Sequence, residues 1–184
     1  EWSSSYSPRD VVHDSYINAP YVLTKLKQAR GLAQGMSYWA YTDLFEEAGP
    51  PPASFHGGFG LMNREGVRKP TWFAYKYLNQ LTGREIPTND ELAWATVDER
   101  KIAILAWDWQ QPVQDVSNRP FYTRKLVARP AVPLSIHLKS IQPGSYRLKV
   151  HRTGYLKNDP LSAYIDMGLP SDVSAVQLNA LKSA

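Results

Sequence analysis

Carboxylates are the side chains of this sequence best suited to chemistry, and eight of them lie in its first 85 residues. Two carboxyl groups about 5–5.5 Å apart can cleave a glycosidic bond, one as nucleophile and the other as acid/base. The candidates are Glu1, Asp10, Asp14, Asp43, Glu46, Glu47, Glu65 and Glu85. Their spacing alone does not choose among them. Glu46 and Glu47 follow a predicted strand, where sites lie in α/β folds, but such a loop pair is more often part of a solvated surface.

Other reactive side chains give weaker signals. The sequence has no cysteine, and its four histidines are scattered without the spacing of metal ligands, so we expect no metal site and no cofactor. No glycine-rich loop of the phosphate-binding types occurs. His13 and His56 are candidates to line a pocket. His56, between Phe55 and a glycine pair, either contacts substrate or braces its loop.

The composition excludes several classes of protein. Apolar residues make up 43% and charged residues 21% of the 184, which is typical of a globular chain. The net charge of +4 is spread among charges of both signs, which argues against a nucleic-acid surface. No apolar run is long enough to cross a membrane. The 6 Trp and 11 Tyr could stack against sugar rings, although most are expected in packing. The cellular compartment stays open.

The elements of residues 1–85 must position any site there. A helix is predicted over about residues 16–30, capped by Asp14 or Ser15 and stopped by Gly31. A strand is predicted over 35–41, a short extended piece over 58–62, and a second helix from Pro70 to Gly83. This order indicates an α/β unit with a parallel strand. One strand cannot bury two helices, so we expect its partner strands on chain upstream of residue 1.

Residues 86–184 have a different pattern. Residues 92–97 and 101–107 alternate around a tight turn at 98–100, which predicts a β-hairpin. Further strands are predicted at 122–128, 132–138 and 146–151, and a helix at 172–182 with Ser171 as its cap. We therefore predict two domains, an α/β part over 1–85 and an antiparallel β domain with a C-terminal helix over 86–184.

Several ordered motifs resemble glycoside hydrolase family 39, the β-xylosidases and relatives such as α-L-iduronidases. Residues 1–6 (EWSSSY) resemble the segment that ends the seventh barrel strand of that family, and 36–43 (MSYWAYTD) resemble the eighth strand. The loop motifs FEE, PPP and FHGGFGL at 45–47, 50–52 and 55–61, and KPTWFAY at 69–75, resemble the loop and helix that follow. AILAWD, HRTGY and SAYIDMG at 103–108, 151–155 and 162–168 also fit bacterial members.

The resemblance implies the C-terminal portion of a (β/α)₈ TIM barrel, followed by a small antiparallel β-sandwich. It implies a retaining exo-glycosidase that hydrolyses terminal β-1,4-linked xylose from xylo-oligosaccharides. Matched position by position, Glu1 is the nucleophile and Trp39 an aromatic wall of the sugar site. Glu46 and Glu47 match acceptors of xylose hydroxyls, a role that suits carboxylates. The acid/base is expected upstream, so this chain alone should be inactive without its missing barrel segment.

Two alternatives stay open. The β domain could be a non-catalytic carbohydrate-binding or assembly module, and a homo-oligomer is possible because family members differ in oligomeric state. A related barrel with another sugar specificity is the second alternative. An iduronidase would need a basic group for the substrate carboxylate, and the acidic pair Glu46 and Glu47 argues against one.

Overall fold

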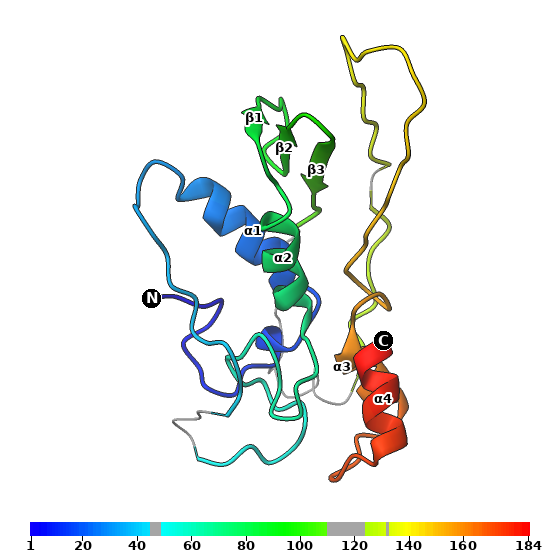
Figure 1. Cartoon of the computed structure of the whole chain (residues 1–184). Helices are drawn as coiled ribbons and strands as arrows, with labels where there is room; N and C mark the ends of the chain where they lie inside the picture. The colour runs from blue at the N-terminus through cyan, green and yellow to red at the C-terminus, as the bar shows by residue number, and fades with distance from the viewer. Residues whose placement is uncertain (45–48, 110–123, 132) are drawn as a thin grey trace.

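The computed structural model describes residues 1–44, 49–109, 124–131 and 133–184. Its elements are a short 3₁₀ helix η1, four α-helices and three strands (Figure 1). They are η1 Val11–His13, α1 Asn18–Gln28, α2 Pro70–Leu78, β1 Arg84–Ile86, β2 Ala93–Val97, β3 Ile102–Ala106, α3 Pro160–Asp166 and α4 Ala175–Ser183. Among these described residues, no helix has the length and apolar character needed to cross a membrane.

Helix α1 confirms the first predicted helix but not its cap. The N-cap is Ile17, which makes no side-chain capping bond, and Ser15 Oγ accepts only from the Ile17 amide. The Asp14 carboxylate is committed elsewhere, to the Gly57 amide and the Lys69 ammonium. Asp14 therefore does not cap α1. The helix ends as predicted, shortly before Gly31, whose φ of 76° favours glycine.

Helix α2 begins as predicted, with Pro70 in its first turn, where a missing amide hydrogen costs least. It ends at Leu78, and Gly83 follows with a φ of 86°. Ala74 of α2 packs against Ala19 and Leu23 of α1, and Leu105 of β3 joins the same apolar cluster. The two helices and the β-sheet therefore share one small core.

The predicted strand over 35–41 is only partly formed. Tyr38 makes a single parallel bridge to Trp2, and Thr42 makes one to Met62. Residues 35–41 form no ladder, because one isolated bridge at Tyr38 and another just beyond the segment at Thr42 do not make a strand. The described residues accordingly contain no eight-stranded barrel; around the predicted strand they show isolated parallel bridges, Trp2 with Tyr38 and Thr42 with Met62.

The one sheet of the described residues is antiparallel, in the order β1-β2-β3. The predicted hairpin is confirmed: five residue pairs join β2 and β3, from Ala93 with Ala106 to Val97 with Ile102. Strand β1 was not predicted. It pairs with β2 and spans the predicted domain boundary at 85/86.

The three further predicted strands are not formed where the structure describes them. Residues 124–131 and 133–151 are extended but belong to no ladder, and they run out and back as a long excursion (Figure 1). The first part of the predicted strand 122–128, and residue 132 of the next one, lie outside the described residues. With a single three-stranded sheet, the described residues do not form a β-sandwich.

The C-terminal helices differ from prediction in two respects. Helix α3 was not predicted; the Asp159 side chain caps it and Pro160 opens it. Helix α4 begins at Ala175, not 172, because Ser174 rather than Ser171 caps it, in a capping box with Gln177. These helices bury Leu161, Tyr164 and Leu181 against residues of the first region, Val11, Phe55 and Val67.

Candidate active site

Glu1 and Trp39 lie on two extended segments that run side by side. The Trp2 amide donates to Ser37 O at 3.0 Å, and the Trp39 amide donates to Trp2 O at 3.0 Å. These two hydrogen bonds fix the register in which Trp2 stands opposite Tyr38. Sequence-distant segments bearing the predicted nucleophile and the predicted aromatic wall are therefore neighbours.

The aromatic side chains around this pairing show which face points to the helices. Trp2 meets Tyr38 edge-on, with ring centroids 5.7 Å apart, and Tyr38 also contacts Tyr75 of α2. Asn18 of α1 donates to the Tyr38 hydroxyl at 3.0 Å. Successive side chains of extended chain point to opposite faces. By this alternation we expect Glu1 and Trp39 on the face turned away from α1 and α2; Glu1 is exposed and Trp39 partly buried.

The tyrosines on the helix side stay neutral. Burial raises the pKa of Tyr38 and of Tyr75 above the ordinary value for a phenol. Neither therefore supplies a negative charge near Glu1 at neutral pH.

A third segment, Gly57 to Leu61, lies along the other side of the Trp39 segment. The Ala40 amide donates to Phe59 O at 3.1 Å, and the Leu61 amide donates back to Ala40 O at 3.0 Å. Gly60 allows this close approach: a Cβ there would lie 2.4–2.5 Å from backbone atoms of Thr42, Asp43 and Met62. The residue after Trp39 is thus held directly by the 57–61 segment.

Beneath these segments lies a fully buried charge cluster, Asp14, Asp43 and Lys69. The Lys69 Nζ is 2.6 Å from Asp14 Oδ1 and 2.7 Å from Asp43 Oδ2, and none of the three side chains is exposed. Lys69 Nζ also donates to Gly58 O at 2.8 Å. The other carboxylate oxygens accept from backbone amides, Asp14 Oδ2 from Gly57 at 2.6 Å and Asp43 Oδ1 from Gly60 at 2.7 Å.

The charges of this cluster follow from burial and pairing. The two carboxylates outweigh desolvation at Lys69 and raise its pKa, so the ammonium stays charged. Burial raises the pKa of Asp43, and the neighbouring Asp14 adds to this effect, while Lys69 opposes it. Two carboxylates sharing one cation leave one of them easier to protonate.

His13 and His56, the two histidines predicted to line a pocket, both contact backbone carbonyl groups. His13, 1% exposed, has its Nδ1 2.8 Å from Gly57 O and its Nε2 3.2 Å from Ser5 O. Burial lowers its pKa, although the contact with Gly57 O opposes this. His56 is also buried, with Nδ1 3.1 Å from Ala53 O, a contact that favours the bracing interpretation over the substrate-contact one.

Glu46 and Glu47 lie outside the described residues, so their predicted role as hydroxyl acceptors stays a prediction. The part of the chain that the structure describes has no cluster of three His, Asp or Glu side chains able to hold a metal ion.

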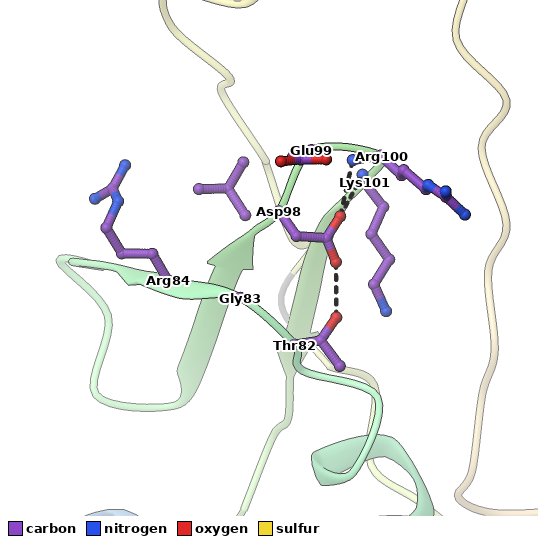
Figure 2. Close-up of a pocket in the computed structure, with 8 residues that line it drawn as sticks. Thr82, Gly83, Arg84, Asp98, Glu99, Arg100 and Lys101 are labelled. Carbon is purple, nitrogen blue, oxygen red and sulfur yellow. Dashed lines mark hydrogen bonds between the residues drawn. The ribbon is translucent and has the colours of Figure 1, made fainter.

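A hollow at the tip of the β2–β3 hairpin contains none of the predicted site residues. Figure 2 shows its charged lining, with Arg84 on one side and Arg100 and Lys101 on the other. The Asp98 carboxylate is used internally, accepting from Thr82 Oγ1 and from the Arg100 and Lys101 amides. The hollow is a product of the turn and has no evident part in the chemistry of Glu1.

The buried charge cluster was missed by sequence reasoning. The sequence indicates Lys69 only as part of the motif at 69–75 that opens a helix, and Asp14 as a candidate carboxylate or a helix cap. A signal was present: Lys69 is the N-cap residue, yet its side chain cannot accept a hydrogen bond from the helix amides. A lysine there needs another partner for its ammonium, and acidic residues follow both the first loop and the predicted strand.

The sequence model of glycosyl hydrolases family 39 matches residues 1–184, and the chain belongs to this family. Among curated relatives, a β-xylosidase of Caldicellulosiruptor saccharolyticus is 29% identical over 191 residues, which is 100% of this chain and 36% of the relative. A β-xylosidase of Geobacillus stearothermophilus is 35% identical over 108 residues, 59% of this chain and 21% of the relative.

Solved structures agree with this assignment. The family 39 enzyme from Xanthomonas axonopodis pv. citri is 63% identical with a TM-score of 0.94, over 98% of this chain and 36% of that one. A monomeric β-xylosidase from Caulobacter crescentus CB15 is 55% identical with a TM-score of 0.94, over 98% and 37%. The chain therefore spans about a third of the length of these similar proteins.

Proposed function

We propose that this chain is the nucleophile-bearing part of a retaining β-xylosidase that releases terminal xylose from β-1,4-linked xylo-oligosaccharides. The observation that supports it most is the backbone pairing that brings the segments of Glu1 and Trp39 together, in a chain that belongs to family 39. In this proposal residues 1–85 belong to the end of a (β/α)₈ barrel, and residues 86–184 are an accessory domain.

Each proposed role follows from the chemistry of the side chain. Glu1, exposed and on the face turned away from the helices, attacks the anomeric carbon of the terminal xylose and forms a xylosyl ester as the aglycone leaves. Trp39 offers an apolar face to the sugar ring. Glu46 and Glu47 accept hydrogen bonds from xylose hydroxyls.

A second carboxyl group must protonate the leaving oxygen and then activate the water that hydrolyses the ester. We propose that this acid/base lies on chain that the 184 residues do not include, because the resemblance puts it on an earlier barrel strand. The 184 residues alone are then expected to be inactive.

The test is a nucleophile exchange in the full-length protein. Glu1→Ala should lose nearly all kcat toward an aryl β-xyloside, since no ester can form. Added azide should restore turnover by attacking the opposite face of the sugar, giving the α-xylosyl azide. The control Glu85→Ala, at an exposed carboxylate paired with Arg30, should leave the rate unchanged. An unchanged rate in Glu1→Ala would exclude Glu1 as nucleophile.

The stereochemistry has its own measurement. Proton NMR of the first product formed should show β-xylose, because two displacements at the anomeric carbon retain its configuration. A first product of α-xylose would mean an inverting enzyme.

A non-catalytic carbohydrate-binding or assembly module is less favoured, because the family match spans all 184 residues and both curated relatives are β-xylosidases. One similar structure is described as monomeric, so a homo-oligomer stays a prediction only.

A further inference from the structure

We infer that Lys69, acting with Asp14 and Asp43, is a positioning residue for the sugar-binding face of Trp39. The inference rests on the proposed function, since it assigns to Trp39 a contact with the terminal sugar. Lys69 itself is fully buried and does not touch substrate; it acts through the backbone of residues 57–61.

The buried charge cluster fixes the backbone of residues 57–61 by hydrogen bonds. Asp14 accepts the Gly57 amide, Lys69 donates to Gly58 O, and Asp43 accepts the Gly60 amide. His13 contacts Gly57 O from the same side. Three charged side chains from three separate segments thus fix a glycine-rich stretch that would otherwise be among the most flexible of the chain.

Residues 57–61 are in turn hydrogen-bonded to the segment that contains Trp39. Phe59 and Leu61 bond both sides of Ala40, the residue that follows Trp39, and Asp43 itself lies at the end of the same segment. Gly60 packs so closely on Thr42 and Asp43 that even one added carbon would force a backbone shift. A displacement of residues 57–61 is therefore transmitted to Ala40 and Trp39. The Trp39 amide in turn bonds Trp2 O, one residue from Glu1.

The energetic cost of burying three charged groups also favours a positioning role for the cluster. Burying charged groups in a protein is expensive, and well-packed apolar side chains of similar volume are often as stable or more stable. Stability alone is thus a weak reason for a fully buried Lys69 with two carboxylates. Charge-assisted bonds are short and directional, which suits a cluster that fixes backbone position.

The experiment uses the full-length protein and compares Lys69→Met in two backgrounds, wild type and Trp39→Phe. Lys69→Met keeps an unbranched side chain as far as the ε position and removes the ammonium. Lys76→Met on the exposed side of α2 is the matched control and should leave kcat/KM unchanged. For each variant kcat, KM and Tm are measured with an aryl β-xyloside, at a temperature where all variants are folded.

With Trp39 present, Lys69→Met should lower kcat/KM about 10- to 100-fold, because small misplacements of a binding group have effects of this size. In the Trp39→Phe background, where the indole platform is already lost, the same change should lower kcat/KM less than about threefold. The fall in Tm should be equal in both backgrounds. An effect of Lys69→Met on kcat/KM that depends on Trp39, together with an effect on Tm that does not, indicates that Lys69 positions Trp39.

Equal losses of kcat/KM in the two backgrounds, or no loss in either, would overturn the inference and leave Lys69 a purely structural residue. Failure of the proposed function looks different, since the unsubstituted enzyme would then not hydrolyse the xyloside at all.

If Lys69→Met yields no folded protein, the variant Asp43→Asn tests the inference in its place. It keeps the shape and an oxygen acceptor for the Gly60 amide, and removes one ion pair of Lys69. The inference expects a loss of kcat/KM of at least about threefold that shrinks in the Trp39→Phe background. Wild-type kcat/KM in Asp43→Asn would overturn it.

Discussion

The β2–β3 hairpin and the long excursion over 124–151 are both out-and-back stretches of extended chain with alternating apolar residues, yet only the hairpin pairs. In the hairpin, five residue pairs form a ladder. In the described part of the excursion no ladder forms, and Leu134, Ile136, Tyr146, Leu148 and Val150 are all exposed. Apolar and polar residues alternate in both stretches, so alternation does not explain why only the hairpin forms a ladder.

Two features, a fixed turn and a packing surface, distinguish the hairpin. Its turn is fixed by Asp98, whose carboxylate accepts the Arg100 and Lys101 amides and the Thr82 hydroxyl (Figure 2). Its inner face has a surface to cover, because Leu105, Trp94 and Trp107 pack on α1 and α2. A hairpin alone is at best marginally stable, and such a packing surface is what stabilises it.

The excursion is held at its base, not along its length. Lys125 pairs with Asp166 of α3 at 2.7 Å, and Tyr77 and Asn158 bond the backbone or side chains of residues 152 and 153. Between these anchors Leu134, Ile136, Leu148 and Val150 stay exposed, so the described residues give them no packing surface. Alternating apolar residues therefore form a strand here only where the turn is fixed by hydrogen bonds and an apolar surface lies against the strands.

The largest effect is expected at the packing surface of the hairpin. Leu105→Ala should lower the free energy of unfolding by about 2–4 kcal/mol, because it removes a buried side chain from the cluster with Leu23 and Ala74. Urea unfolding measures this. Ile104→Ala, on the other face of the same strand and 37% exposed, is the control and should cost clearly less. Equal losses at both positions would mean that the hairpin is not stabilised by its contact with the helices.

The same distinction explains which elements could be predicted from the sequence. The tight turn of the hairpin, the start of α2 at Pro70 and the end of α1 near Gly31 depend on residues within a few positions of one another. The cap of α1 could not be predicted, because Lys69 and Gly57, far along the chain, take the Asp14 carboxylate. The strands at 132–138 and 146–151 failed for the complementary reason, since ladder partners are not encoded in the strand itself.

The candidate site shows the same limit. Glu1 and Trp39 could be named only by resemblance, because the spacing of eight carboxylates selects none of them. That their segments pair in register depends on the Trp2 and Ser37 backbone groups, which carry no sequence signal. The sequence could indicate that Lys69 needs a partner but not which one, because its partners Asp14, Asp43 and Gly58 come from three separate segments.

A smaller effect, dependent on pH, is expected at the turn of the hairpin. Hydrogen bonds from the Arg100 amide and the Thr82 hydroxyl lower the pKa of Asp98 below 3.8. A lowered pKa in the folded state means that ionised Asp98 stabilises the fold above pH 3.8, and that this is lost as the pH falls through the folded-state value. Asp98→Ala should therefore lower Tm by a few degrees at pH 7 and by less at pH 3.

Differential scanning calorimetry at the two pH values measures this difference. Glu99→Ala, at the next residue of the same turn, is the control and should leave Tm unchanged at both. A loss of Tm in Asp98→Ala that does not change with pH would mean that the carboxylate charge has no part in fixing the turn.

The smallest effect is expected in the excursion. Leu148 is 87% exposed, so its removal exposes little new apolar surface, and Leu148→Ser should change the free energy of unfolding by less than about 0.5 kcal/mol. Urea unfolding beside Leu105→Ala compares the two stretches directly. A loss approaching that of Leu105→Ala would mean that Leu148 is covered by residues outside the described ranges. The excursion would then also have a packing surface, one that lies outside the described residues, and its alternating apolar residues would have indicated that surface correctly.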